Sequence, residues 1–428
     1  MKKLLTLVVL CSAYLFPQTN DLNITGAGAR AEGFGGAFIG LADDATAVVW
    51  NPAGLSQLER PEASIVTRFK GESADFSNSI DPSLDAKESQ SNFSLNFGSL
   101  ALPVSSGDMK IVVAAAFQRQ LDFYESQQRQ VEMPGTGIFS PNYIESQRSE
   151  THGGVNTITP AVGIRFNPMI SFGLSTNIWI GSLTATDQLH DSRVVVHDED
   201  TYDLKYSGLN FVFGGLLDFE GVKNGIPLKV GLTFRTPFKL KATGTYNMVR
   251  RIASNGTAQF DIEQEIEMPF MFGMGTSYRI GENLTVAMDY EIRNYGTKSI
   301  TSTATHQATG LTGTNVEDIS ESKQNLNEFR IGAEYLIVTD NFVIPVRGGF
   351  KTVPSVFADY VYDNTTGSYV PTSTQTSGTG FSVGTGYIAN AFAIDVTYSR
   401  SGYTQKFDTD GKIDYGFGTV GSSIIIYF

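Results

Sequence analysis

Basic side chains stand at alternating positions in the second half of this 428-residue sequence, where they could hold a negatively charged group. Arginine pairs a carboxylate through two parallel hydrogen bonds, and lysine does so as a point charge. The basic residues that share one face of their predicted strands are Lys229, Arg235, Lys239, Lys241, Arg293, Arg330, Arg347 and Lys351. We expect ligand contacts first from Arg235, Arg330 and Arg347, and then from Arg293 and Lys351.

A purely structural role competes with ligand binding for each of these residues. Buried charges must be paired, and several carboxylates fall on the same strand faces. These carboxylates are Asp289, Glu291, Glu328, Glu334 and Asp395. For any single basic residue the structural role is the commoner outcome, so the sequence leaves both roles open.

The segments that must position these charges alternate in polarity. Residues 285–292 read T-V-A-M-D-Y-E-I, and apolar side chains there oppose charged ones. Successive side chains of a strand point to opposite faces, so one face is apolar and the other is charged. Residues 329–335, 342–351 and 392–399 repeat this alternation.

The connections between these segments alternate strictly between short and long. The predicted short turns lie at 105–108, 167–168, 220–224, 281–283, 339–341 and 389–391, and the predicted long polar loops lie at about 71–90, 124–153, 185–204, 242–265, 298–324 and 355–377, with a shorter one at 406–412. This pattern is typical of outer-membrane barrels. We predict an all-β, membrane-spanning antiparallel up-and-down β-barrel of about 14 strands, whose strands begin near 63, 91, 109, 155, 169, 205, 227, 266, 284, 325, 342, 378, 392 and 413.

The first residues predict export. Lys2 and Lys3 precede an apolar run from Leu4 to Phe16, which is too short to span a bilayer as a helix. We therefore expect a signal peptide over 1–18 and no transmembrane helix after its removal. Cys11, the only cysteine, lies within this segment, so we expect no thiol or disulfide in the mature chain. The alternative is a lipoprotein with Cys11 as the lipidated residue, but the bulky Leu10 before it is unfavourable.

The charge and the carboxyl terminus agree with the barrel. The formal net charge is −13, which disfavours nucleic acid as a partner. The chain ends in Tyr427 and Phe428. This ending resembles the signal that the outer-membrane barrel-insertion machinery recognises, so we expect that machinery as a partner during biogenesis. Outer-membrane lipid and lipopolysaccharide would surround the finished barrel.

The segment before the first strand does not alternate. Glycines punctuate small residues over 26–40, and Asp43 and Asp44 could cap a short helix that ends at about Trp50, before Asn51 and Pro52. So much glycine suits a compact plug threaded where side chains would not fit. We therefore place a partly helical plug in the lumen over 19–62 and the barrel over 63–428.

This segment resembles the plug of the FadL/toluene-channel family. The stretches that carry the resemblance are residues 28–38, residues 42–45 and Asn51-Pro52-Ala53-Gly54-Leu55, in which Asn51, Pro52 and Ala53 form that family's characteristic triplet. Residues 228–237, 269–290, 329–335 and 346–350 look similar as well, in the same order along the chain. The resemblance implies fourteen strands, a lateral gap in the wall beside the plug, and import of long-chain fatty acids or aromatic hydrocarbons.

We accordingly expect an outer-membrane channel, with both termini periplasmic, that takes up hydrophobic compounds, most simply long-chain fatty acids, along a continuous apolar tunnel. Asn51-Pro52-Ala53 could be the latch of the plug or only a turn between helix and strand. The same plug motif occurs in barrel subunits of protein-secretion systems, so secretion-system proteins are the alternative partners.

Other motifs in the sequence give little support for a function. Residues 416–421 match a dinucleotide fingerprint only formally, because they lie within a predicted strand. His190, Asp191 and residues 197–200 could bind a cation, but solvated loop charge explains them better. The sequence contains no H-E-x-x-H, and its G-x-S-x-G at 380–384 lies within a predicted strand, not at the strand-to-helix elbow that a nucleophilic serine needs. We expect no enzymatic activity, no cofactor and no metal.

Overall fold

The computed structural model describes residues 26–80, 82, 85–106, 109–133, 143–193, 197–222, 224–252, 256–365, 367–408 and 410–428. The predicted signal peptide lies outside the described residues. Among those that are described, no helix is both long enough and apolar enough to span a membrane.

Nineteen strand segments form one sheet that closes on itself, because β1 pairs with both β2 and β19. The first nine are β1 (Glu62–Asn78), β2 (Ala86–Ser106), β3 (Met109–Asp122), β4 (Glu125–Met133), β5 (Tyr143–Arg165), β6 (Ile170–Asp191), β7 (His197–Asp218), β8 (Leu228–Arg235) and β9 (Phe238–Arg250). The remaining ten are β10 (Gly256–Met268), β11 (Met271–Ile280), β12 (Leu284–Arg293), β13 (Ser299–His306), β14 (Thr312–Asp318), β15 (Leu326–Val338), β16 (Val343–Asp363), β17 (Ser368–Ile388), β18 (Phe392–Phe407) and β19 (Gly411–Tyr427).

The segments combine into fourteen antiparallel barrel strands. Nine run without interruption, and five consist of two segments in line: β3 with β4, β8 with β9, β10 with β11, β12 with β13, and β14 with β15. Pro237 and Pro269 lie in two of the interruptions, since proline cannot donate to a ladder. The predicted strand number and closed barrel are confirmed.

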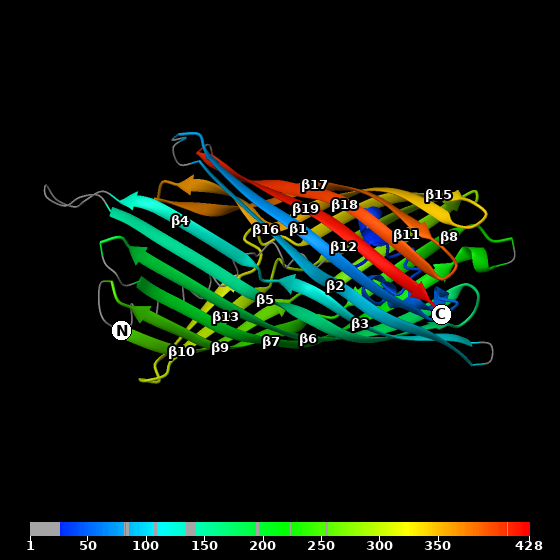
Figure 1. Cartoon of the computed structure of the whole chain (residues 1–428), viewed down its shortest axis with the longest axis horizontal. Helices are drawn as coiled ribbons and strands as arrows, with labels where there is room; N and C mark the ends of the chain where they lie inside the picture. Colours follow the sequence, from blue (N-terminus) through cyan, green and yellow to red (C-terminus); the bar gives the residue numbers. More distant parts are fainter. Residues whose placement is uncertain are drawn as a thin grey trace.

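The strands run steeply along one long axis, and the carboxyl terminus lies at the end where the plug also sits (Figure 1). We call this end the turn end and the opposite end the loop end. At the turn end β1 and β19 are in register from Glu62 opposite Tyr427.

An apolar belt surrounds the turn-end half of the barrel. On β18, for example, the outward side chains of Phe392, Ile394, Val396 and Tyr398 are exposed, whereas Asp395 and Thr397 between them are buried inside. This is the alternation that the sequence predicts for a sheet with lipid on one face and a polar interior on the other.

Several predicted loops are strands instead. The structure begins β5 at Tyr143, β7 at His197, β10 at Gly256 and β17 at Ser368, about ten residues before the predicted starts. The outward faces of these extensions are largely polar, so they lack the outward apolar row that marks a strand in a membrane. The short turns at 167–168, 281–283, 339–341 and 389–391 are confirmed.

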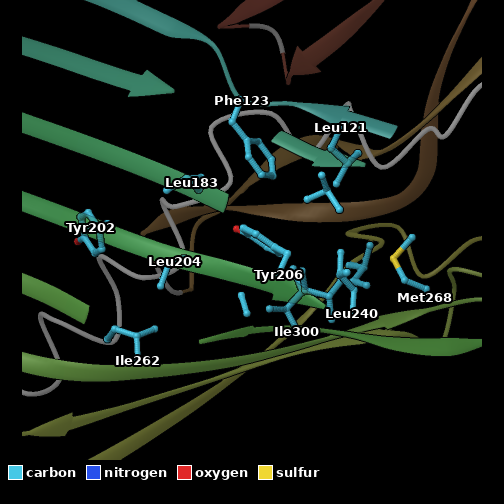
Figure 2. Packing of buried hydrophobic residues seen from close by; sticks show 14 of the residues in the cluster. Leu121, Phe123, Leu183, Tyr202, Leu204, Tyr206, Leu240, Ile262, Met268 and Ile300 are labelled. Carbon is cyan, nitrogen blue, oxygen red and sulfur yellow. The ribbon is translucent and has the colours of Figure 1, made fainter. Parts of the chain in front are cut away.

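One side of the lumen, towards the loop end, is filled with apolar side chains. They come mainly from β5, β6, β7, β9, β10 and β13, and Figure 2 shows Leu183, Tyr206, Leu240 and Met268 among them. A sheet that closes around a wide interior must fill it or leave it wet, and this half is packed as a core. The other half of the lumen is open and polar.

The plug fills the turn end. It contains the short helices α2 (Ala29–Gly33) and α3 (Ala47–Trp50) and the 3-10 helix η2 (Pro52–Gln57). The predicted helix ending at Trp50 is present, and its N-cap is Thr46, whose N–H donates to Asp44 Oδ1 at 2.8 Å. The helix α2 was not predicted, because five residues are too few for a periodic pattern.

Candidate functional site

A cavity of about 190 Å³ lies in the lumen against the plug. Plug residues Trp50 and Glu32 form part of its lining, and side chains from β1, β2, β3 and β15 to β19 form the rest. Much of that lining is charged, amide or hydroxyl groups, and the remainder is apolar. It therefore differs from the continuous apolar tunnel that the resemblance led us to expect.

Two of the expected ligand arginines form one ion network. Arg330 lies next to Glu328 (2.7 Å) and Glu291 (3.4 Å), and Arg293 contacts the same two carboxylates at 2.9 and 2.5 Å. Both guanidinium groups are almost completely buried. Arg330 also lies 5.6 Å from the ring of Trp50, so the network contacts the plug. These contacts correspond to the structural role.

Arg347 joins a second network, which ties the plug to the wall. Its guanidinium lies 2.6 Å from Glu334 and 2.6 Å from Asp395. Arg30, in plug helix α2, pairs with Asp43 within the plug and lies 3.1 Å from Glu334 of β15. Sequence reasoning missed Arg30; the one available signal was its position as the only basic residue in the glycine-rich segment.

The other two candidates have no such partner. Within the described part of the chain, the side chains of Lys351 and Arg235 take part in no ion pair and no hydrogen bond. Lys351 lines the cavity beside the plug. Arg235 lines a smaller space of about 30 Å³ between Trp50 and the wall, and its Nη1 is buried without a partner.

The prediction that Lys239 and Lys241 face the lumen is wrong. Both side chains are more than half exposed and pair with Glu265 outside the barrel. Leu240 and Ala242 point inward instead and are completely buried. The strand is interrupted after Arg235, at Thr236 and Pro237, and the parity of its faces changes there.

Asn51, Pro52 and Ala53 fasten the plug to the opposite wall. Asn51 Nδ2 donates to Ile39 O at 2.9 Å and to Gly215 O of β7 at 3.1 Å, and its Oδ1 accepts from Ala53 N. A Cβ at Gly214 would lie 2.2 Å from Asn51 Oδ1, so glycine is required where the triplet meets the wall. The triplet thus makes the turn from α3 into η2 and a wall contact at once.

The barrel wall is split on one side. β2 and β3 are paired from Phe97 opposite Gln118 to Ser106 opposite Met109. In the part of the chain that the structure describes, no backbone pair joins residues 86–96 of β2 to β3 or β4, although β2 continues to pair with β1 there. We call this split the wall slit. A cavity of about 420 Å³ lies in it.

The cavity in the slit adjoins the cavity beside the plug. Asn92, Ser94, Arg119, Asp122 and Tyr124 line both. On the outer side the slit is bordered by Phe93 and Leu95, which are 67% and 49% exposed and belong to the upper edge of the apolar belt. The two spaces therefore lie side by side, one in the lumen and one in the wall, with these side chains between them.

Local backbone features open the slit. The register of β3 against β5 shifts between Arg119 and Leu121, and Gly153 and Gly154 of β5 have φ values of +127° and +157°. A Cβ at Gly154 would lie 2.5 Å from Arg119 Nη1, so the kinked wall leaves no room for a side chain there.

Two side-chain bridges cross the slit in place of a ladder. Asn92 donates to Asp122 at 2.7 Å, and Gln127 donates to Glu88 at 3.2 Å. Such contacts between part-exposed polar side chains break far more easily than a run of backbone pairs.

The described residues contain no group of three His, Cys, Asp or Glu side chains arranged to hold a metal ion.

Comparisons with known proteins agree with this architecture. A model of the BamG family matches residues 29–342. No curated protein sequence matches the chain. Among solved structures, a FadL homologue from Pseudomonas aeruginosa is 12% identical with a TM-score of 0.63, and it covers 95% of this chain and 99% of its own.

Two toluene transporters have the same fold. TodX of Pseudomonas putida is 13% identical with a TM-score of 0.62, and TbuX of Ralstonia pickettii is 13% identical with a TM-score of 0.58; each covers 95% of this chain and 99% of its own. At such identities the likeness shows the fold. The chain belongs to the BamG family, and it has the plugged fourteen-strand outer-membrane barrel fold of the FadL homologue and the toluene transporters.

Proposed function

We propose that this protein is an outer-membrane channel for hydrophobic compounds, which enter at the loop end, lodge beside the plug and leave sideways through the wall slit. In this orientation the turn end, with the plug and the carboxyl terminus, faces the periplasm. The barrel acts by binding and guiding its cargo, without catalysis.

The observation that carries the proposal is that the lumen cavity and the cavity in the slit lie side by side and share lining residues. A compound that is poorly soluble in water gains free energy in proportion to the apolar area that stays out of water. A lateral exit beside Phe93 and Leu95 lets such a compound pass from the lumen to the apolar belt without crossing the plug. The buried ion networks around Arg30 and Arg347 favour a plug that remains in place.

Long-chain fatty acids are the cargo that we put first. A carboxylate needs a cation that is not already neutralised, so Lys351 and Arg235 are better candidates than Arg293, Arg330 and Arg347. Arg235 lies in a space that is too small for more than one or two water-sized groups. Lys351 is therefore the residue that we expect to meet the carboxylate.

The test is to close the slit. We expect no cysteine in the mature chain, so the double variant Asn92→Cys with Asp122→Cys would contain a single cysteine pair. The two positions are those whose side chains bridge the slit in the structure. Cells that lack their own importer would express this variant, and uptake of labelled oleate and labelled toluene would be measured before and after oxidation. We expect uptake to fall about tenfold or more when the pair is linked and to return on reduction.

The matched control is a pair across an intact hairpin. Thr303→Cys with Thr314→Cys joins two strands that are already paired and whose hydroxyls lie 3.2 Å apart. Linking this pair should leave uptake unchanged. Undiminished uptake with the slit closed would contradict the lateral route. A correctly inserted barrel that takes up neither compound but captures secretion proteins would favour the alternative, a subunit of a secretion system.

A further inference from the structure

Four residues that line the lumen cavity carry oxygen atoms for which the described residues supply no hydrogen-bond donor. These atoms are Glu32 Oε2, Gln90 Oε1, Asn96 Oδ1 and Gln120 Oε1. Each is a buried acceptor, and Asn96 as a whole is only 2% exposed. Buried polar atoms in folded proteins nearly always have a partner. The cavity therefore calls for an occupant that donates several hydrogen bonds.

The cavity also holds a cation that forms no direct ion pair with any of the described residues. Arg68 pairs with Glu32, Lys70 with Glu72, and Arg119 lies 3.6 Å from Asp122. Lys351 lines the same space, and in the described part of the chain no carboxylate lies within ion-pair distance of it. A buried cation in this position favours an occupant with one negative charge.

Part of the lining near Lys351 is apolar. It consists of Leu326, Val353 and Val356, and Leu326 and Val356 belong to the packed core of which Figure 2 shows other members. The slit lies on the side of β2 and β3, past Tyr124, where Phe93 and Leu95 lie on the outer surface. An apolar chain can pack against Leu326, Val353 and Val356 while the headgroup meets the polar side chains of β2 and β3.

We propose that the preferred cargo is a single-chain amphiphile whose headgroup carries both a negative charge and free hydroxyl groups, as a glycerol phosphate or an acidic sugar does. The charge pairs with Lys351, the hydroxyls donate to the acceptors of Asn96, Gln90 and Gln120, and the chain packs against Leu326, Val353 and Val356. This inference rests on the proposed function and narrows it: a bare hydrocarbon would satisfy none of these groups, and a fatty acid would satisfy only the lysine.

The experiment is a competition for binding by the full-length protein in detergent, measured by native mass spectrometry. The probes share one acyl chain: oleoyl lysophosphatidylglycerol, oleate and monooleoyl glycerol, with octadecene as the hydrocarbon. We expect the lysophospholipid to bind about tenfold more tightly than oleate, because two or more hydrogen bonds to otherwise unpaired acceptors are gained.

Two variants separate the contributions. Asn96→Leu with Gln120→Leu removes two acceptors and should reduce binding of the lysophospholipid to that of oleate, which it should leave unchanged. Lys351→Met should weaken both anionic probes about tenfold and spare monooleoyl glycerol. Lys239→Met, on the outer surface, is the control and should change nothing. A boiling-dependent shift in gel mobility checks that each variant is folded.

The outcomes are distinct. Equal affinity of wild-type protein for oleate and the lysophospholipid, or a preference that survives the loss of Asn96 and Gln120, would overturn the headgroup inference; water would then occupy the acceptors. The proposed function would still stand, because oleate would bind. Failure of every probe to bind, with no uptake in cells, would instead overturn the proposed function itself.

Discussion

The basic side chains of the lumen differ in whether their removal would leave an unpaired carboxylate. Arg347 has a completely buried side chain between Glu334 and Asp395, whereas Lys351 faces open space in the cavity. A buried ion pair adds little net stability compared with an apolar core, but loss of one partner leaves a charge that nothing compensates. Stability should therefore depend on Arg347, and ligand affinity on Lys351.

Replacement of Arg347 by methionine should destabilise the barrel strongly. Glu334 would keep Arg30, but Asp395 would lose the only cation within ion-pair distance among the described residues. We expect the free energy of unfolding, measured with urea in lipid vesicles, to fall by about 3–5 kcal/mol. The control is Lys239→Met, which removes an exposed ion pair and should change the free energy of unfolding little. Equal losses in the two variants would contradict a special role of the plug network.

Most of the wall could be predicted from signals that are local in the sequence. The remaining parts could not, because they depend on contacts with residues far away in the sequence. Turns such as Asn167-Pro168 and strands such as β12 carry their pattern within ten residues. The extensions of β7 and β10 do not, since their outward faces are polar and lack the apolar residues of a strand that faces lipid. The inward face of Lys239 was predicted wrongly because the break at Pro237 shifts the parity by an amount that only the partner strands determine.

The candidate site was predicted in part. Parity brought Arg293, Arg330, Arg347 and Lys351 into the lumen, as the structure has them. The sequence could not predict which of these residues form ion pairs, because the possible carboxylate partners lie on neighbouring strands and on the plug. The wall slit is likewise an absence of pairing between two segments, and its one local signal is the Gly153-Gly154 pair.

At the scale of one strand, β16 offers a matched pair of glycines. A Cβ at Gly349 would lie 2.1 Å from the backbone nitrogen of Gly35 in the plug, whereas a Cβ at Gly348 would meet nothing within 4 Å. Gly349→Ala should therefore push the plug from the wall at a cost of about 1–3 kcal/mol, and Gly348→Ala should not. Single-channel conductance in planar bilayers would measure the difference, since a displaced plug admits ions.

We expect a raised conductance for Gly349→Ala alone. Both variants remove one glycine from the same strand, so their effects on the unfolded chain are alike and cancel in the comparison. If the conductances of both variants matched that of the wild type, the plug would adapt to the added methyl group, and the close approach of Gly35 to β16 would not be what seals this side of the lumen.

At the scale of the whole molecule, the position of the membrane follows from the outer surface. The apolar belt covers only the turn-end half of the strands, and the rest of the barrel projects beyond it with a polar outer face and an interior that is packed on one side. Val396 of β18 lies within the belt between Ile394 and Tyr398, whereas Val316 lies on β14 in the projecting part, and both are exposed.

An arginine at these two positions should have very different effects. Val396→Arg places a charge in the hydrocarbon and should reduce the free energy of unfolding by about 2–4 kcal/mol, whereas Val316→Arg should cost about 0–1 kcal/mol. Urea unfolding of the barrel reconstituted in vesicles measures both. In detergent micelles the difference should shrink, because a micelle deforms around a charge. Equal costs in vesicles would mean that the bilayer does not sit on this belt, and the wall slit, which opens at the belt's upper edge, would then discharge its cargo into water.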